Sequence, residues 1–165
     1  MRLAARDGKN IPFFVYGTLL SGFNNHKLVA SRIQKIVPAS ITGVQLAHFT
    51  EGFPGIYPAR NKAVATVQGE LLFPQGGEEE SVLEILDKLE GYFGEGDARN
   101  EYERKMVLAQ PNDGRSAAVQ AQAYFCLRVD EWGGIPVQEG DWRRYMTDGD
   151  GVIKPHSGEE WSPNS

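Results

Sequence analysis

The sequence predicts one α+β domain, a small sheet with a few helices packed outside it. Several short segments rich in β-branched and aromatic residues are separated by turns containing Gly and Pro, which is typical of strands. Residues 78–90 instead repeat their apolar residues at helical spacing. A chain of 165 residues, 41% hydrophobic and 24% charged, is long enough to bury its own core. We therefore expect a single domain over residues 1–147, followed by a loosely ordered tail over residues 148–165.

The first predicted strand leads into a turn that is suited to binding an anion. Phe13–Tyr16 is an apolar and aromatic run, Gly17 breaks it, and Thr18 follows with a hydroxyl that could cap a new turn. A strand that ends in this way leaves several backbone N–H groups unpaired and pointing in one direction. Such a cluster attracts a carboxylate without any basic side chain. An ordinary turn from a strand into a loop explains the same residues equally well.

The remaining elements follow from local patterns. Residues 27–37 are ambiguous, but their apolar residues fall near helical spacing and favour a helix that Pro38 would end. A polar loop over residues 93–101 is long enough to form the rim or lid of a pocket. Glu70 could face a pocket, although an outward-facing strand carboxylate explains it more simply. Strands are predicted at residues 39–49, with a bulge at Gly43, and at 56–59, 64–73, 102–108 and 117–129, and residues 50–55 are predicted to form a hairpin connection.

The predicted helix aims one carboxylate at its apolar side. At about 100° per residue, its apolar residues cover an arc of roughly 160°, and Glu84 and Lys88 lie opposite. Glu90 lies between Leu83 and Leu86, roughly 20° from the first and 40° from the second. A carboxylate buried there needs a partner or a raised pKa, which is the property of a general acid or base. If the helix instead ends before Glu90, the residue lies at the surface.

Four motifs, in this order, resemble the gamma-glutamylcyclotransferase-like superfamily, and in particular its bacterial members of the gamma-glutamylamine cyclotransferase type. The resemblance covers most of the chain, from Phe13 to Tyr145. The motifs are Tyr16-Gly17-Thr18-Leu19 with Gly22 and Asn25-His26, then Leu86-Asp87-Lys88-Leu89-Glu90-Gly91-Tyr92, then Tyr102-x-Arg104, and finally Gly140-Asp141-Trp142-Arg143-Arg144-Tyr145.

The resemblance implies a fold and an activity. It implies a small mixed β-barrel of about five to seven strands, with the last motif packed over it. It implies an enzyme that releases 5-oxoproline from a gamma-glutamyl amine or peptide by intramolecular attack of the substrate's amine. In this family the glutamate at the position of Glu90 is the catalytic acid and base, and the turn Tyr16, Gly17, Thr18 and Leu19 lines the substrate pocket.

Other residues of these motifs have simpler roles. Tyr102 could present its hydroxyl to the substrate, and a packed tyrosine explains it about as well. Asp87 is expected to cap or orient local backbone, and Arg104 to form a structural ion pair. A non-catalytic module that binds a small carboxylate in the same pocket is the alternative function.

Composition excludes several other classes. A net charge of −5 without a basic run argues against a nucleic-acid surface. Cys126 is expected to be a core residue, and the three histidines lack the spacing of metal ligands, so we expect neither a metal site nor a cofactor. The first ten residues lack the apolar segment of a signal peptide, and no stretch reaches the ~18 apolar residues of a membrane span. We therefore expect a cytoplasmic enzyme that acts on a small molecule and has no membrane or nucleic-acid partner.

Overall fold

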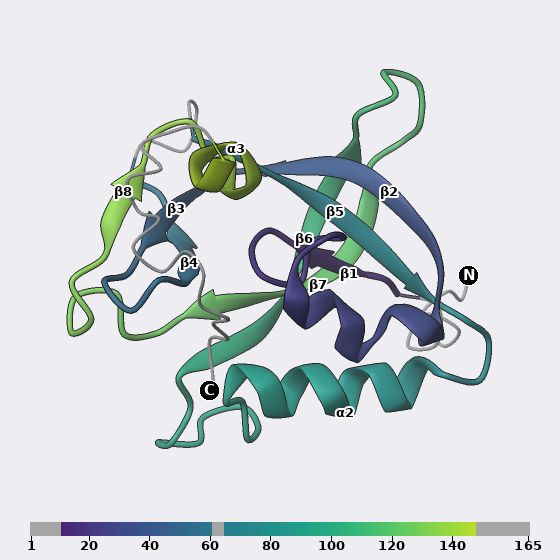
Figure 1. Cartoon of the computed structure of the whole chain (residues 1–165), viewed down its shortest axis with the longest axis horizontal. Helices are drawn as coiled ribbons and strands as arrows, with labels where there is room; N and C mark the ends of the chain where they lie inside the picture. Colours follow the sequence, from purple (N-terminus) through teal and green to yellow (C-terminus); the bar gives the residue numbers. More distant parts are fainter. Residues whose placement is uncertain (1–10, 61–64, 148–165) are drawn as a thin grey trace.

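A closed five-stranded barrel forms the centre of the computed structural model, which describes residues 11–60 and 65–147 (Figure 1). Going around the barrel, the strands follow the order β1, β5, β2, β6, β7. Neighbouring strands are antiparallel except β1 and β7, which pair in parallel and close the barrel. The predicted small mixed barrel is confirmed. Its strands are β1 (Phe13–Val15), β2 (Ile33–Thr42), β5 (Thr66–Pro74), β6 (Tyr102–Pro111) and β7 (Val119–Cys126).

A second sheet stands beside the barrel. It has three antiparallel strands in the order β4 (Pro54–Pro58), β3 (Val44–His48), β8 (Ile135–Val137). The single strand predicted over residues 39–49 is wrong, because Gly43, with φ of 86°, divides it into β2 and β3. That left-handed backbone conformation suits Gly and turns the chain from the barrel into the second sheet. The predicted hairpin connection over residues 50–55 is confirmed by the pairing of β3 with β4.

The helix predicted over residues 27–37 is also wrong. Two short 3₁₀ helices, η1 (Asn24–Leu28) and η2 (Ala30–Arg32), precede β2, which begins at Ile33. The β-branched residues Ile33, Ile36 and Val37 lie in β2, where they pair with β5. The pairing of these residues with β5 stabilises a strand more than their weak helical spacing favours a helix. Pro38 lies within this strand, opposite Glu70.

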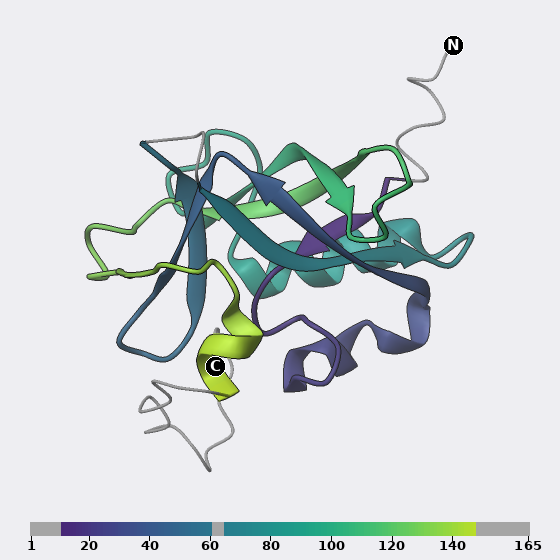
Figure 2. The ribbon, with the colours of Figure 1, turned by 90° about the horizontal axis from the view of Figure 1, so that it is seen from above.

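Helix α2 (Glu79–Glu90) lies along the outside of the barrel, as Figures 1 and 2 show. The predicted apolar face is confirmed, since Val82 and Leu86 are fully buried while Glu84 and Lys88 are exposed. Gly91 ends the helix in the left-handed conformation, with φ of 69°.

The last described element, α3 (Trp142–Thr147), packs against both sheets. Gly140, with φ of 65°, brings its carbonyl within 2.8 Å of the N–H of Gln68 in β5. A side chain at Gly140 would collide with the backbone of Thr66, because its Cβ would lie 2.0 Å from the Thr66 carbonyl oxygen. The Trp142 ring stacks on His48 of the second sheet at 5.4 Å. The tail predicted over residues 148–165 lies outside the described residues.

Candidate active site

The turn after β1 presents unpaired backbone N–H groups. Phe13–Val15 is completely buried, and the chain leaves the sheet at Tyr16. The Leu20 N–H donates to the Gly17 carbonyl at 3.0 Å, which tightens the turn. Within the described part of the chain, the N–H groups of Gly17, Thr18 and Leu19 have no hydrogen-bond acceptor. The turn is therefore equipped to bind an anion.

Gly17 allows the turn to approach Pro54 of β4. A Cβ at position 17 would lie 2.3 Å from Pro54 Cγ, so any other residue would push the two segments apart. The Pro54 carbonyl accepts a hydrogen bond from the Tyr102 hydroxyl at 2.8 Å, and the Tyr124 carbonyl accepts one from Tyr16 at 2.8 Å. Both tyrosines line the pocket with their hydroxyls already donating to backbone. Tyr102 is thus held by the backbone of β4 while it lines the pocket, and its contact with substrate stays a prediction.

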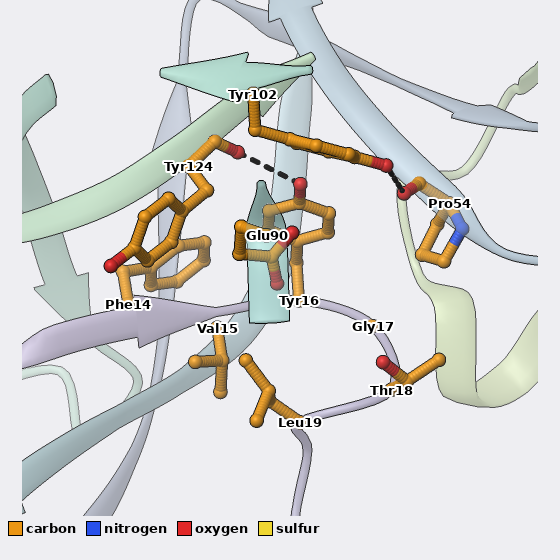
Figure 3. A pocket seen from close by; sticks show the side chains of 10 residues that line it. All are labelled: Phe14, Val15, Tyr16, Gly17, Thr18, Leu19, Pro54, Glu90, Tyr102 and Tyr124. Carbon is orange, nitrogen blue, oxygen red and sulfur yellow. Dashed lines mark hydrogen bonds between the residues drawn. The ribbon is translucent and has the colours of Figure 1, made fainter. Parts of the chain in front are cut away.

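Glu90 is the last residue of α2, and its side chain projects into the same pocket (Figure 3). Burial, and then the neighbouring carboxylate of Glu101, raise the pKa of Glu90 to about 8. The residue Glu90 is half-buried when all its atoms are counted, but its carboxyl group is surrounded by protein. The burial of the carboxyl group is what determines its pKa. The alternative in which the helix ends before Glu90 is therefore wrong.

The pocket brings all the predicted site residues together. Tyr16, Gly17, Thr18, Leu19, Glu90 and Tyr102 line it, and Figure 3 shows the Glu90 carboxyl group at the centre of the side chains drawn. Sequence reasoning missed four further lining residues, which are Phe14, Val15, Pro54 and Tyr124. No residue of the loop over 93–101 is among the lining residues, and Asn100 closes that loop by accepting from the Phe93 N–H and donating to the Gly94 carbonyl.

A side-chain network fixes the last turn of α2 beside the pocket. Asp87 accepts two hydrogen bonds from the Arg104 guanidinium, at 2.9 and 3.2 Å, and one from the Tyr124 hydroxyl. Arg104 also donates to Gln122 at 2.9 Å. The predicted structural ion pair of Arg104 is confirmed. The role expected for Asp87 is wrong, since its carboxylate joins the helix to side chains of β6 and β7 instead of capping local backbone.

The cysteine and the possible metal ligands of the described residues do not form a further site. Cys126 is buried, as predicted, and burial raises the pKa of its thiol to about 11. Within residues 11–60 and 65–147, no three His, Cys, Asp or Glu side chains are grouped closely enough to hold a metal ion. No helix in the described part of the chain has the length and apolarity needed to cross a membrane.

Comparisons with known proteins agree with the fold and show the family. A family model described as "Gamma-glutamyl cyclotransferase, AIG2-like" matches residues 13–144. The "Gamma-L-glutamyl-butirosin B gamma-glutamyl cyclotransferase" of Niallia circulans is 33% identical over 132 residues, which cover 80% of this chain and 75% of the relative.

Solved structures show the same fold. YkqA from Bacillus subtilis superposes with a TM-score of 0.61 at 21% identity over 90% of this chain, which spans 44% of YkqA. At5g39720.1 from Arabidopsis thaliana gives a TM-score of 0.57 at 26% identity, with 82% of this chain and 78% of that protein covered. An AIG2-like protein from Mus musculus gives a TM-score of 0.54 at 22% identity, with 81% of this chain and 88% of that protein covered.

A small closed barrel beside a three-stranded sheet, with one pocket lined by Glu90 and by the turn after β1, defines the class of domain. Within that class, the chain belongs to the gamma-glutamyl cyclotransferase, AIG2-like family. It is an enzyme of the gamma-glutamyl cyclotransferase kind, and the resemblance predicted from its motifs is confirmed.

Proposed function

We propose that this enzyme cyclises a gamma-glutamyl amine or peptide to 5-oxoproline and a free amine, with Glu90 as the single general acid and base. One observation carries the proposal. A carboxyl group whose pKa is raised to about 8 shares a pocket with the Gly17–Leu19 N–H groups, which have no acceptor among the described residues. The reaction itself requires no metal or organic cofactor.

The proton balance suits one carboxyl group. In the substrate, the α-nitrogen enters as an ammonium group and must lose two protons as it attacks the γ-carbonyl carbon and closes the ring. The leaving nitrogen gains two protons when the old C–N bond breaks. Glu90 can take each proton from the first nitrogen and pass it to the second, and it ends the cycle in its starting state.

The raised pKa of Glu90 makes this transfer easier. An ordinary glutamate is too weak a base to deprotonate an α-ammonium group, whose pKa lies several units higher. A carboxyl group with a pKa of about 8 is much closer to that ammonium group, so the transfer costs less free energy. The arriving ammonium group would also stabilise the ionised form of Glu90.

The Gly17–Leu19 turn supplies the anion-binding half of the site. Its N–H groups would hold the α-carboxylate of the substrate and orient the amine toward Glu90. Holding both reacting groups of one molecule in line favours ring closure, because little further freedom is lost on the way to the transition state.

The gamma-glutamyl group is the part of the substrate that we propose the pocket recognises, and the proposal does not specify the leaving amine. Two findings support this. One is the family match, and the other is the name of the Niallia relative, a gamma-glutamyl cyclotransferase of gamma-L-glutamyl-butirosin B. Among the residues that the structure describes, neither Lys nor Arg lines the pocket, so the anion would be held by backbone N–H groups.

A panel of gamma-glutamyl amines and dipeptides, scored for 5-oxoproline, tests the proposal. The wild type should turn over at least one compound, and Glu90→Gln should lose about 10²-fold or more of kcat because Gln cannot exchange a proton. Glu84→Gln, on the exposed face of the same helix, is the matched control and should keep full activity.

The pH dependence provides a second measurement. Since kcat/KM reports the ionisation of the free enzyme, it should rise with pH through about 8 as Glu90 loses its proton. A Glu90→Gln protein with undiminished turnover would exclude Glu90 as the proton carrier. Binding of gamma-glutamyl compounds without any turnover would favour the non-catalytic module instead.

A further inference from the structure

We propose that Glu70 and Arg143 are positioning residues that hold the Gly17–Leu19 turn in its substrate-binding conformation through Ser21. This inference rests on the proposed function, in which that turn binds the substrate carboxylate. Neither residue lines the pocket, so both would act through the backbone of the turn.

Glu70 and Arg143 engage Ser21 at every polar group it has. The Glu70 carboxylate accepts from the Ser21 N–H and from the Ser21 hydroxyl, each at 2.8 Å. Arg143 donates to the Ser21 carbonyl at 2.9 Å and to Glu70 at 3.2 Å. The guanidinium of Arg143 also lies over the Phe23 ring, 5.5 Å from its centre. These contacts form a closed ring of three residues, which we call the Ser21 clamp.

The clamp joins the turn to two distant elements. Glu70 belongs to β5, where it pairs with Val15 at the end of β1, and Arg143 belongs to α3. The Glu70 side chain is 13% exposed, so Glu70 is not the outward-facing carboxylate that the sequence favoured. A carboxylate placed there without partners would be costly, and Ser21 and Arg143 provide those partners.

A second set of contacts braces the other part of the turn. The Asn25 amide donates to the Thr18 hydroxyl at 3.0 Å, and His26 Nδ1 lies 2.9 Å from the Leu19 carbonyl oxygen, which fits a donated hydrogen bond. These contacts come from η1, a few residues along the chain. The Ser21 clamp instead ties the turn to the barrel and to α3, and it thereby sets the position of the turn relative to Glu90.

The clamp and the pocket lie on different sides of the turn. Leu20, Glu70 and Arg143 line a separate hollow of about 240 Å³, and this hollow shares no lining residue with the pocket that contains Glu90. A change in the clamp therefore leaves the pocket lining intact in composition. The proposed effect on substrate acts through the backbone between Gly17 and Ser21.

Steady-state kinetics with a turned-over gamma-glutamyl compound tests the clamp. In Glu70→Ala the Ser21 N–H loses its acceptor, and we expect KM to rise roughly tenfold because the turn that holds the substrate carboxylate is no longer fixed. We expect kcat to fall as well, because the same turn orients the amine toward Glu90. Glu70→Gln keeps one acceptor and should restore part of the loss. Arg144→Ala, on the same helix but with an exposed side chain paired to Glu139 at 3.7 Å, is the matched control and should behave as wild type.

Two further results separate positioning from a general loss of stability. Partial unfolding would lower kcat through the amount of active enzyme and leave KM unchanged, and that outcome would overturn the proposal. Arg143→Ala combined with Glu70→Ala should be little worse than Glu70→Ala alone, since both act on Ser21. Fully additive losses would contradict a single clamp.

Hydrogen exchange provides a test that does not need turnover. The amides of Leu20, Ser21 and Phe23, which donate hydrogen bonds in this segment, should exchange faster in Glu70→Ala than in Arg144→Ala. Ser21→Ala replaces Glu70→Ala if that variant does not fold. Unchanged exchange in the clamp variants would overturn the clamp. A wild type inactive on the whole panel, with faster exchange in the clamp variants, would count against the proposed function and leave the clamp standing.

Discussion

Glu90 lies at the C-terminal end of α2, beside Glu101 and among the buried tyrosines of the pocket. The Glu101 carboxylate approaches the helix end so closely that a Cβ at Gly91 would lie 3.0 Å from its Oε1 atom. Burial, the adjacent negative charge and the negative end of the helix dipole all disfavour ionised Glu90. The same surroundings raise the pKa of Tyr16 and Tyr102 well above that of a free tyrosine, chiefly through burial, so both stay neutral donors.

The ionisation of Glu90 makes folding stability depend on pH. Its pKa rises from 4.5 when the chain is unfolded to about 8 in the folded protein. Below pH 4.5 the carboxyl is protonated in both states and carries no penalty. As pH rises toward 8 the unfolded state ionises first, so stability falls by up to about 1.4 kcal/mol per unit of pKa difference, and the penalty is complete above 8.

Glu90→Gln should remove this penalty. The difference in unfolding free energy between Glu90→Gln and wild type should be small near pH 5 and should grow by a few kcal/mol in favour of the variant by pH 8. Urea denaturation at several pH values measures it, with Glu84→Gln as the reference variant. A difference that does not change with pH would show that Glu90 titrates normally.

At the scale of an element, α2 is held by a different ion pair at each end. Arg32 pairs with Glu78 at 3.0 Å before its first turn, and both side chains are 39% exposed. Arg104 pairs with Asp87 in its last turn, where the side chains are 24% and 23% exposed and Tyr124 joins the network. The second pair is the better shielded of the two and lies next to the catalytic candidate.

This asymmetry predicts unequal effects of removing each arginine. Arg104→Met should lower the unfolding free energy by about 1–3 kcal/mol, because it removes the guanidinium from the half-buried Asp87, which keeps only the Tyr124 hydroxyl, and from Gln122. Arg32→Met should cost only about 0–1 kcal/mol, as exposed ion pairs do. Urea denaturation measures both, and an equal loss in the two variants would contradict the reasoning.

At the scale of the whole molecule, α3 joins the barrel to the second sheet. Gly140 and Arg143 contact β5, while Trp142 stacks on His48 at the end of β3 and on Tyr145 at 5.9 Å. Trp142 is 1% exposed and is among the largest fully buried side chains of the core. We infer from this that the described residues, 11–60 and 65–147, act as a single folded domain.

Trp142 should therefore be important for global stability. Trp142→Ala is expected to lower the unfolding free energy by about 3–5 kcal/mol, the usual cost of a large cavity, out of a total of about 5–15 kcal/mol for a domain. Arg144→Ala, two residues along, should change it by less than about 0.5 kcal/mol. Thermal and urea unfolding of both variants measures the difference, and a Trp142→Ala protein as stable as wild type would show that α3 is dispensable.

The sequence by itself determined the features that depend on local spacing. The apolar face of α2, the placement of Glu90 on it, the Gly91 cap and the Gly-Thr break after β1 follow from residues a few positions apart, and all are present. The tertiary structure alone decided which strand residues 33–37 pair with, that Gly43 turns the chain into a second sheet, and that Pro54 and Tyr124 complete the pocket. It also decided that Glu70 meets Ser21, 49 positions away, and Arg143, 73 positions away. Contacts between residues so far apart depend on how the strands are ordered around the barrel, and no local pattern of residues encodes that order.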